Sequence, residues 1–232
     1  MMSRNVTRTR ALIALLLLVP APSLGSAMGL WVAPGPVGKT VYAVCKIWIL
    51  VLPLVWLLAV ERGKLSLSPA RRGGFGFGVL SGVLIGALIV GAYYLFAAAQ
   101  IDPATLRELA AANGFDRRPV FLAFAAYLIL VNALLEEYVW RWFVYTRWET
   151  IVAGPVAVAL AAVCFTLHHI LVLASFVPWS LTILGASGVF VGGVVWSWSY
   201  RRYRSIWPGY VSHAIVDAAI LALGWRLLFS PA

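Results

Sequence analysis

The sequence predicts an all-α fold, a polytopic bundle of about seven transmembrane helices with eight as the upper count. Three observations predict it. Hydrophobic residues make up 62% of the 232 positions and charged residues only 11%, with a mean hydropathy of +0.92. Apolar runs that reach the roughly 20 residues needed to cross a bilayer recur along the whole chain. Most basic residues lie in the short segments between these runs, where such residues act as topology signals.

The net charge and the placement of the cysteines exclude several classes of function. A net charge of +10 would suggest a nucleic-acid partner in a soluble protein. Here the basic segments are better explained by the cytoplasmic face of a membrane and its anionic lipid headgroups. We therefore expect the lipid bilayer, and no nucleic acid, as a partner. Cys45 and Cys164 lie inside apolar runs, which argues against a disulfide framework or a cysteine zinc site.

Seven runs qualify as spans: 11–32, 39–60, 75–99, 119–146, 151–174, 178–200 and 205–229. The first run follows Arg4, Arg8 and Arg10 and leads to small residues ending at Ala27, a pattern shared with secretory signal peptides. Because apolar residues resume at Leu30, we interpret residues 1–27 as part of a retained first span. With the N-terminus in the cytoplasm, the clearly basic loops lie inside, as the positive-inside rule requires. These loops contain Arg62, Lys64, Arg71, Arg72, Arg201, Arg202 and Arg204.

Two local patterns outside the motifs also predict structure. The stretch from Asp102 to Gly114 is typical of a short interfacial helix, with Asp102 as N-cap and Pro103 in the first turn. Glycines recur every fourth residue at the start of the third span, a ribbon that predicts close helix packing. This ribbon comprises Gly74, Gly78, Gly82 and Gly86. No internal repeat is present, so the chain is best described as one membrane domain with a motif-free part, 1–118, and a motif-bearing core, 119–232.

Ionisable residues within the spans are the main functional signal, because each costs about 2.5 to 3.5 kcal/mol to insert at the bilayer centre. Eight such residues lie away from the span ends: Lys46, Glu136, Glu137, Arg141, His168, His169, His213 and Asp217. Lys46 is about five residues into its span, so its side chain can reach the membrane surface. We therefore assign it no function. The other seven lie in the fourth, fifth and seventh spans.

The fourth span contains two adjacent glutamates with different expected roles. Glu137 and Arg141 are four residues apart on one helical face, in the favourable order for an ion pair. Glu136 points about 100° away and has only Asn132, one turn earlier, as a neighbour on its own helix. We infer a structural Glu137–Arg141 pair beside a Glu136 that is free to react. The alternative is that all three charges neutralise one another as packing contacts.

The fifth and seventh spans supply imidazoles at a similar depth. Of the adjacent His168 and His169, only one is expected to point into a given site. His213 and Asp217 lie four apart on one face, so the carboxylate can orient the imidazole or both can reach one ligand. Counting 1.5 Å per residue from the proposed cytoplasmic ends places Glu136, His169 and His213 in one layer near the bilayer midplane or on its cytoplasmic side.

In order along the chain, these residues resemble the three signatures of the CAAX protease and bacteriocin-processing family of intramembrane proteases. The signatures are EExxxR, FxxxH and HxxxN or HxxxD on successive membrane helices. They correspond here to Glu136–Arg141, Phe165–His169 and His213–Asp217. The resemblance implies a glutamate-dependent endopeptidase that acts on a membrane-embedded or lipidated protein or peptide, in an integral protein of the bacterial plasma membrane.

The resemblance also implies residue roles. Glu136 and His169 would activate a water that attacks the scissile carbonyl, and His213 with Asp217 would face the oxyanion. Arg141 with Glu137 would hold the site together, and Phe165 would be a packing residue whose spacing selects His169 over His168. An ionised Asp217 cannot donate to an oxyanion, so we favour a role in which Asp217 orients His213.

Two rival functions remain open. Glu136, His169 and His213, with Asp217, are chemically suitable zinc ligands. The HExxH arrangement is absent and the resemblance points to a metal-free site, so no cofactor is expected. A proton-coupled transporter, or a scaffold that uses the polar cluster for packing, is the other alternative, because carboxylate and histidine chains occur in pumps. The absence of repeats and the ordered motifs argue against it.

Overall fold

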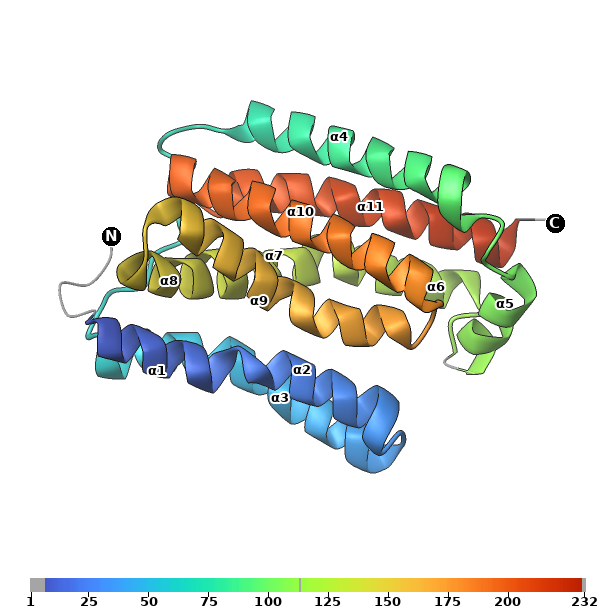
Figure 1. Ribbon diagram of the computed structural model, residues 1–232, viewed down its shortest axis with the longest axis horizontal. Coiled ribbons are helices and arrows are strands. Elements are labelled where there is room, and N and C mark those ends of the chain that lie inside the picture. Colours follow the sequence, from blue (N-terminus) through green and yellow to red (C-terminus); the bar gives the residue numbers. More distant parts are fainter. Residues whose placement is uncertain (1–6, 113, 231–232) are drawn as a thin grey trace.

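The computed structural model describes residues 7–112 and 114–230 as a bundle of long helices (Figure 1). Seven helical segments in this part of the chain are long and apolar enough to cross a membrane. Their bounds are Arg8–Val32, Pro36–Val60, Phe75–Ala97, Arg118–Ile151, Gly154–Ala174, Trp179–Tyr203 and Trp207–Phe229. Each corresponds to one predicted span, with ends shifted by a few residues. The predicted all-α bundle of an integral membrane protein is confirmed.

These segments are built from α-helices and short π-helical stretches (η). In chain order they are α1 (Arg8–Leu18), α2 (Pro20–Ala27), η1 (Met28–Val32), α3 (Pro36–Val55), η2 (Trp56–Val60), α4 (Phe75–Ala92), η3 (Tyr93–Ala97), α5 (Pro103–Ala112), α6 (Arg118–Ala126), η4 (Tyr127–Asn132), α7 (Ala133–Glu136), η5 (Glu137–Tyr145), α8 (Thr146–Ile151), α9 (Gly154–Ala174), α10 (Trp179–Tyr203) and α11 (Trp207–Phe229).

The bundle has a central group of helices with one layer on either side (Figure 1). α9, α10, α11 and the long segment from α6 to α8 form the centre, α4 covers α11, and α1 to α3 form the opposite layer. Within the first helix, Ala11, Ala14 and Leu18 are completely buried, and α1 packs against α8. The first apolar segment is therefore an integral part of the packed bundle, as a retained span would be.

The glycine ribbon of α4 packs directly against α11. A Cβ added at Gly78 would overlap the Pro208 carbonyl, and one at Gly82 would lie 2.9 Å from both Ser212 and Ile215. At Gly86 the nearest atom would be the Ala219 Cβ at 3.2 Å. The predicted packing role is confirmed for these three glycines. Gly74 precedes α4 with a positive φ of 101°, and a Cβ there would also lie 2.9 Å from Pro208. The ribbon sets the position of α11, which contains His213 and Asp217.

The fourth membrane segment differs from the regular helix expected over 119–146. It runs from Arg118 to Ile151, and its central α-helical part, α7, is a four-residue turn between the π-helical stretches η4 and η5. π-helical turns are wider than α-helical turns and often occur at functional sites. Glu136 ends α7 and Glu137 begins η5, so the two glutamates lie where the helical geometry changes.

The interfacial helix predicted after Asp102 is also present as α5. Asp102 caps it, because its carboxylate accepts hydrogen bonds from the Ala104 amide and from the amide and hydroxyl of Thr105. The Thr105 hydroxyl makes the largest contribution to lowering the pKa of the Asp102 carboxyl below its ordinary value. Gly114 follows with φ of +78°, a left-handed conformation typical of a helix stop.

At the end of the bundle opposite α5, the segment 61–74 between the second and third spans is hydrogen-bonded to the start of α11 (Figure 1). The Ser205 hydroxyl donates to the Ser68 carbonyl at 2.7 Å, and the Ile206 amide donates to the Ser68 hydroxyl at 3.0 Å. The Trp207 indole N–H donates to the Leu67 carbonyl at 2.9 Å. This contact joins two of the basic segments, as the predicted cytoplasmic side requires.

Candidate active site

The three motifs meet inside the bundle, beginning with the buried ion pair of the fourth segment. The Arg141 Nε lies 3.4 Å from the Glu137 Oε1, and both side chains are almost completely inaccessible. The Arg141 guanidinium also lies over the rings of Phe165 and Trp196, at 4.5 and 5.1 Å from their centroids. Such cation–π contacts favour a charge that has been removed from water. The predicted Glu137–Arg141 pair is present, and Phe165 packs against it.

Glu137 has a second partner, His213. The His213 Nδ1 lies 3.2 Å from the Glu137 Oε1, so the imidazole donates this hydrogen bond to the carboxylate. The His213 ring also stacks on Trp196, with centroids 3.9 Å apart and planes inclined by 15°. Ser212 accepts the Trp196 indole N–H at 3.0 Å. Stacking on Trp196 therefore fixes the plane of the His213 imidazole, and the hydrogen bond to Glu137 fixes its Nδ1.

This geometry changes the role we expected for Asp217. The Asp217 Oδ1 lies 3.8 Å from the His213 Nε2, which is beyond hydrogen-bonding distance. Because Glu137 already accepts from Nδ1, it is Glu137 that orients His213. Asp217 instead faces the free Nε2 side of the ring, where one-fifth of its side chain remains accessible. Sequence spacing could not reveal this, because Glu137 and His213 are 76 residues apart.

A glycine in the first turns of α11 makes room for the Glu137 carboxylate. A Cβ at position 209 would lie 2.5 Å from the Glu137 Oε2, closer than side-chain atoms approach one another. Gly209 does not have a positive φ, so the requirement for glycine is steric and comes from the neighbouring carboxylate. The buried Glu137 is consequently enclosed by Arg141, His213 and the backbone of α11.

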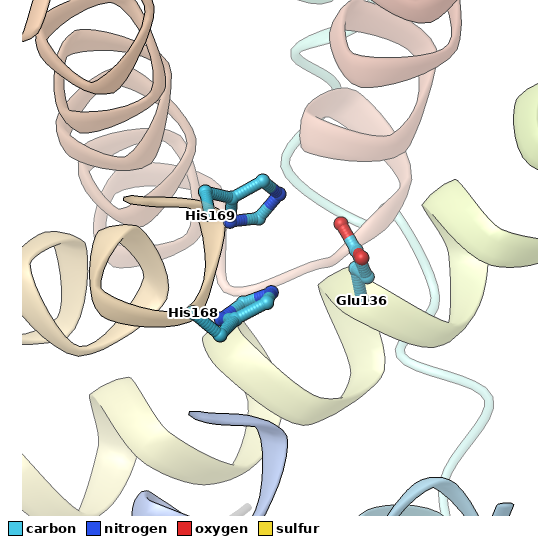
Figure 2. A group of neighbouring side chains, drawn as sticks. All are labelled: Glu136, His168 and His169. Carbon is cyan, nitrogen blue, oxygen red and sulfur yellow. The ribbon is translucent and has the colours of Figure 1, made fainter. Parts of the chain in front are cut away.

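Glu136 points away from this pair and toward the remaining motif residues. Its Oε2 lies 3.6 Å from the His213 Nε2, and 14% of its side chain is accessible. On its other side Glu136 faces His168 and His169 from α9 (Figure 2). One ligand-capable atom from each of these three residues fits within a common span of 4.8 Å. The inferred division between a paired Glu137 and a separate Glu136 agrees with the geometry.

Both adjacent histidines face the site, whereas only one of them was expected to point into it. The His169 Nδ1 lies 2.8 Å from the Phe165 carbonyl oxygen, which places the proton on Nδ1 and leaves Nε2 as an acceptor. His168 stacks on Trp140, with ring planes inclined by 8°, and its ring centroid lies 4.1 Å from that of His169. The 100° that separates neighbours on a helix still allows both rings to border one cavity when the target lies between them.

A possible metal set also differs from the sequence-based set of Glu136, His169 and His213. Within the described residues, the group that could hold a metal ion is Glu136, His168 and His169. His213 is not in that group, and its ring is held by Glu137 and Trp196. The donor atoms are chemically suitable for zinc, and the Phe165 carbonyl behind His169 is the kind of second contact that orients a metal-binding imidazole.

Lys46 was not expected to take part in this region. Instead of extending to the membrane surface, its Nζ donates to the Asn132 Oδ1 at 2.9 Å, one helical turn before Glu136. The only sequence signal was a lysine within a membrane span. The partner lies 86 residues away in the chain, on a different helix, and sequence spacing does not identify such contacts.

Fold and site together define a class of protein, a helical membrane protein with a buried cluster of glutamate and histidine side chains. Residues 118–219 match the family described as Type II CAAX prenyl endopeptidase Rce1-like. All three motifs lie inside this segment, which covers less than half of the chain, and the match is consistent with the family that the resemblance predicted. No curated protein and no solved structure matches the chain.

Proposed function

We propose that this protein is an intramembrane endopeptidase that uses Glu136 as general base to hydrolyse a peptide bond in a membrane-embedded or lipidated substrate. The observation that carries the proposal is the separation of the two glutamates. Glu137 is occupied by Arg141 and His213, whereas Glu136 is partly accessible and faces imidazoles on both sides. A carboxylate with this freedom can take a proton from water.

In the proposed reaction, a water held between Glu136 and His169 attacks the carbonyl carbon of the scissile bond and transfers one proton to Glu136. The His169 Nε2 accepts from that water, since its Nδ1 proton is committed to the Phe165 carbonyl. The tetrahedral intermediate collapses as the carbon–nitrogen bond breaks, and Glu136 returns the proton to the leaving amine. Water is consumed, and a carboxylic acid and an amine are released, which ionise to a carboxylate and an ammonium.

His213 is the proposed group beside the developing oxyanion. Glu137 fixes its Nδ1 proton, and Trp196 fixes its ring plane, so Nε2 has little freedom to reorganise during the reaction. Preorganised groups of this kind provide much of the stabilisation of a transition state. In its protonated form, the imidazolium would donate from Nε2 to the oxyanion, with Asp217 on the same side of the ring.

The Glu136→Gln variant tests the general base. The amide keeps the size of the side chain but cannot accept a proton at neutral pH, so cleavage should fall at least about 100-fold. Mass spectrometry of the membrane proteome, from cells producing wild-type or variant protein, detects the new peptide termini and identifies the substrate. Glu108→Gln, on the exposed face of α5, is the matched control. Wild-type cleavage by Glu136→Gln would rule out this mechanism.

A metal-dependent hydrolase is the second candidate, favoured by the grouping of Glu136, His168 and His169. The His168→Phe variant separates the two candidates, since phenylalanine can retain the stacking on Trp140 but supplies no ligand. A glutamate mechanism predicts activity within about threefold of wild type, because His168 has no step in it. Loss of both bound zinc and activity in this variant, measured by elemental analysis and peptide cleavage, would favour the metal-dependent candidate.

A further inference from the structure

Lys46 is a basic residue of α3 that reaches the site from outside the segment matched by the family. Its side chain is half-buried, and its Nζ lies 2.9 Å from the Asn132 Oδ1 at the end of η4. Its charge is close enough to act on both Glu136 and His168. A lysine within a span is costly, and an apolar residue would satisfy helix packing at lower cost. The contact therefore calls for a role beyond packing.

The first consequence concerns the orientation of the Asn132 amide. A lysine ammonium has three donors and no acceptor, so the oxygen of the amide must face Lys46. The amide nitrogen is then directed to the other side of the side chain. Asn132 and Glu136 are four residues apart, one helical turn along the same segment, so their side chains are neighbours on one face. A carboxylate only accepts, so an amide turned in this way presents its N–H to Glu136.

The three residues thus form a chain of polar contacts. Lys46 donates to the Asn132 amide oxygen, and the Asn132 amide N–H is directed toward Glu136. Without the ammonium, no donor holds the amide oxygen, so the Asn132 side chain is free to turn its N–H away from the Glu136 carboxylate. Lys46 would act on Asn132 as Glu137 acts on His213, by fixing the orientation of a neighbouring side chain. The Glu137 contact orients His213 on the oxyanion side, and the Lys46 contact orients the proposed base, Glu136.

We propose that Lys46 is a positioning residue that holds the Asn132 amide with its N–H toward Glu136, and so fixes the Glu136 carboxylate facing His169 and His213. The inference rests on the proposed function, because it assigns Lys46 to the orientation of the general base. It also assigns a part of the site to α3. The N-terminal spans then contribute to the chemistry as well as to packing.

The geometry is tested without any substrate, by solid-state NMR of the full-length protein in lipid bilayers. The protein is labelled with 15N at asparagine Nδ2 and 13C at glutamate Cδ, and Asn132→Ala distinguishes the Asn132 signal from those of Asn5 and Asn113. The dipolar coupling between the Asn132 Nδ2 and a glutamate Cδ should be present in wild type. It should be lost in Lys46→Met and retained in Lys46→Arg, whose guanidinium can also donate to the amide oxygen.

The kinetic test uses an internally quenched peptide that ends in an S-farnesylated CAAX sequence, the substrate type named in the family description. Lys46→Met should lower kcat on the order of tenfold, as for one lost charge-assisted hydrogen bond, and leave KM within about twofold. Lys46→Arg should recover most of kcat. Lys39→Met, exposed in the first turn of the same helix, should match wild type in both constants.

The outcomes separate the inference from the proposed function. An unchanged NMR coupling or an unchanged kcat in Lys46→Met overturns the positioning role. A coupling that depends on Lys46, in a wild-type protein that cleaves no peptide, supports the positioning contact and counts against the protease function. An increase in KM with kcat unchanged would also overturn the inference, because it would make Lys46 a substrate-binding residue.

Discussion

At the scale of single residues, the site depends on how four charged or titratable groups are divided between structure and chemistry. Glu137 forms an ion pair with Arg141 and accepts a hydrogen bond from His213, which stabilises two groups that would be costly to bury alone. Glu136 keeps a partly accessible carboxylate beside the His213 Nε2. Adjacent residues of the same type thus have environments that suit them to different tasks.

Removing the partner of Glu137 should destabilise the protein. Arg141→Met leaves a carboxylate with no accessible surface and no cation, so we expect a loss of about 3 to 5 kcal/mol in the free energy of unfolding. Thermal unfolding in detergent measures it. The double variant Arg141→Met with Glu137→Gln should recover part of this loss, because no uncompensated charge remains. An Arg141→Met protein as stable as the exposed Arg72→Met control would contradict this account of the pair.

Helical spacing predicted the residue-level features that lie within one helix, and it did not predict those that join helices. The Glu137–Arg141 pair and the separate direction of Glu136 follow from the angle between successive helical positions. The contacts of Lys46 with Asn132 and of Glu137 with His213 depend on tertiary packing. The paired histidines were misjudged because the position of the cavity relative to α9 was unknown.

At the scale of elements, the position of α11 depends on the glycines of α4. At Gly78 and Gly82 there is no room for a Cβ against α11, and at Gly86 an added Cβ would be tightly packed at 3.2 Å from Ala219. The ribbon was predictable because its four-residue spacing is visible in the sequence. The π-helical stretches on both sides of α7 were not, since they arise from packing and leave no periodic signal in an apolar run.

The variant Gly82→Leu tests the fit between α4 and α11. A side chain at this position would meet Ser212 and Ile215, and such overpacking costs about 1 to 3 kcal/mol. Because Ser212 precedes His213, peptide cleavage should decline together with thermal stability. The control is Gly91→Leu in the same helix, where nothing lies within 4 Å of the added Cβ. Equal stability of the two variants would show that the ribbon does not limit the packing distance.

At the scale of the whole molecule, the spans before residue 118 are part of the same structure as the matched segment. α2 packs on α9, α4 packs on α11, and Glu61 forms a buried 2.7 Å ion pair with Arg147 at the start of α8. The number of spans and their approximate ends were predictable because bilayer thickness sets their length. Their arrangement around one another was not, because lipid-facing and helix-facing surfaces are both apolar.

The orientation of the bundle can be measured by labelling introduced cysteines from either side of the membrane. In a background where the buried Cys45 and Cys164 are replaced by alanine, Arg72→Cys should react only with a reagent that enters the cytoplasm. Asp116→Cys, exposed near the opposite end, should react with an impermeant reagent added to intact cells. The reverse pattern would invert the topology and assign the basic loops to the outside, against the positive-inside rule.

The close approach of Glu137 to Gly209 has a consequence for how related chains vary. The backbone at position 209 would accept an L side chain, so the carboxylate is what keeps the position small. The two positions should therefore covary. A larger residue at 209 should occur only in relatives whose position 137 has lost its carboxylate, and a chain with both residues altered would retain the fold while having a different way of holding the histidine of α11.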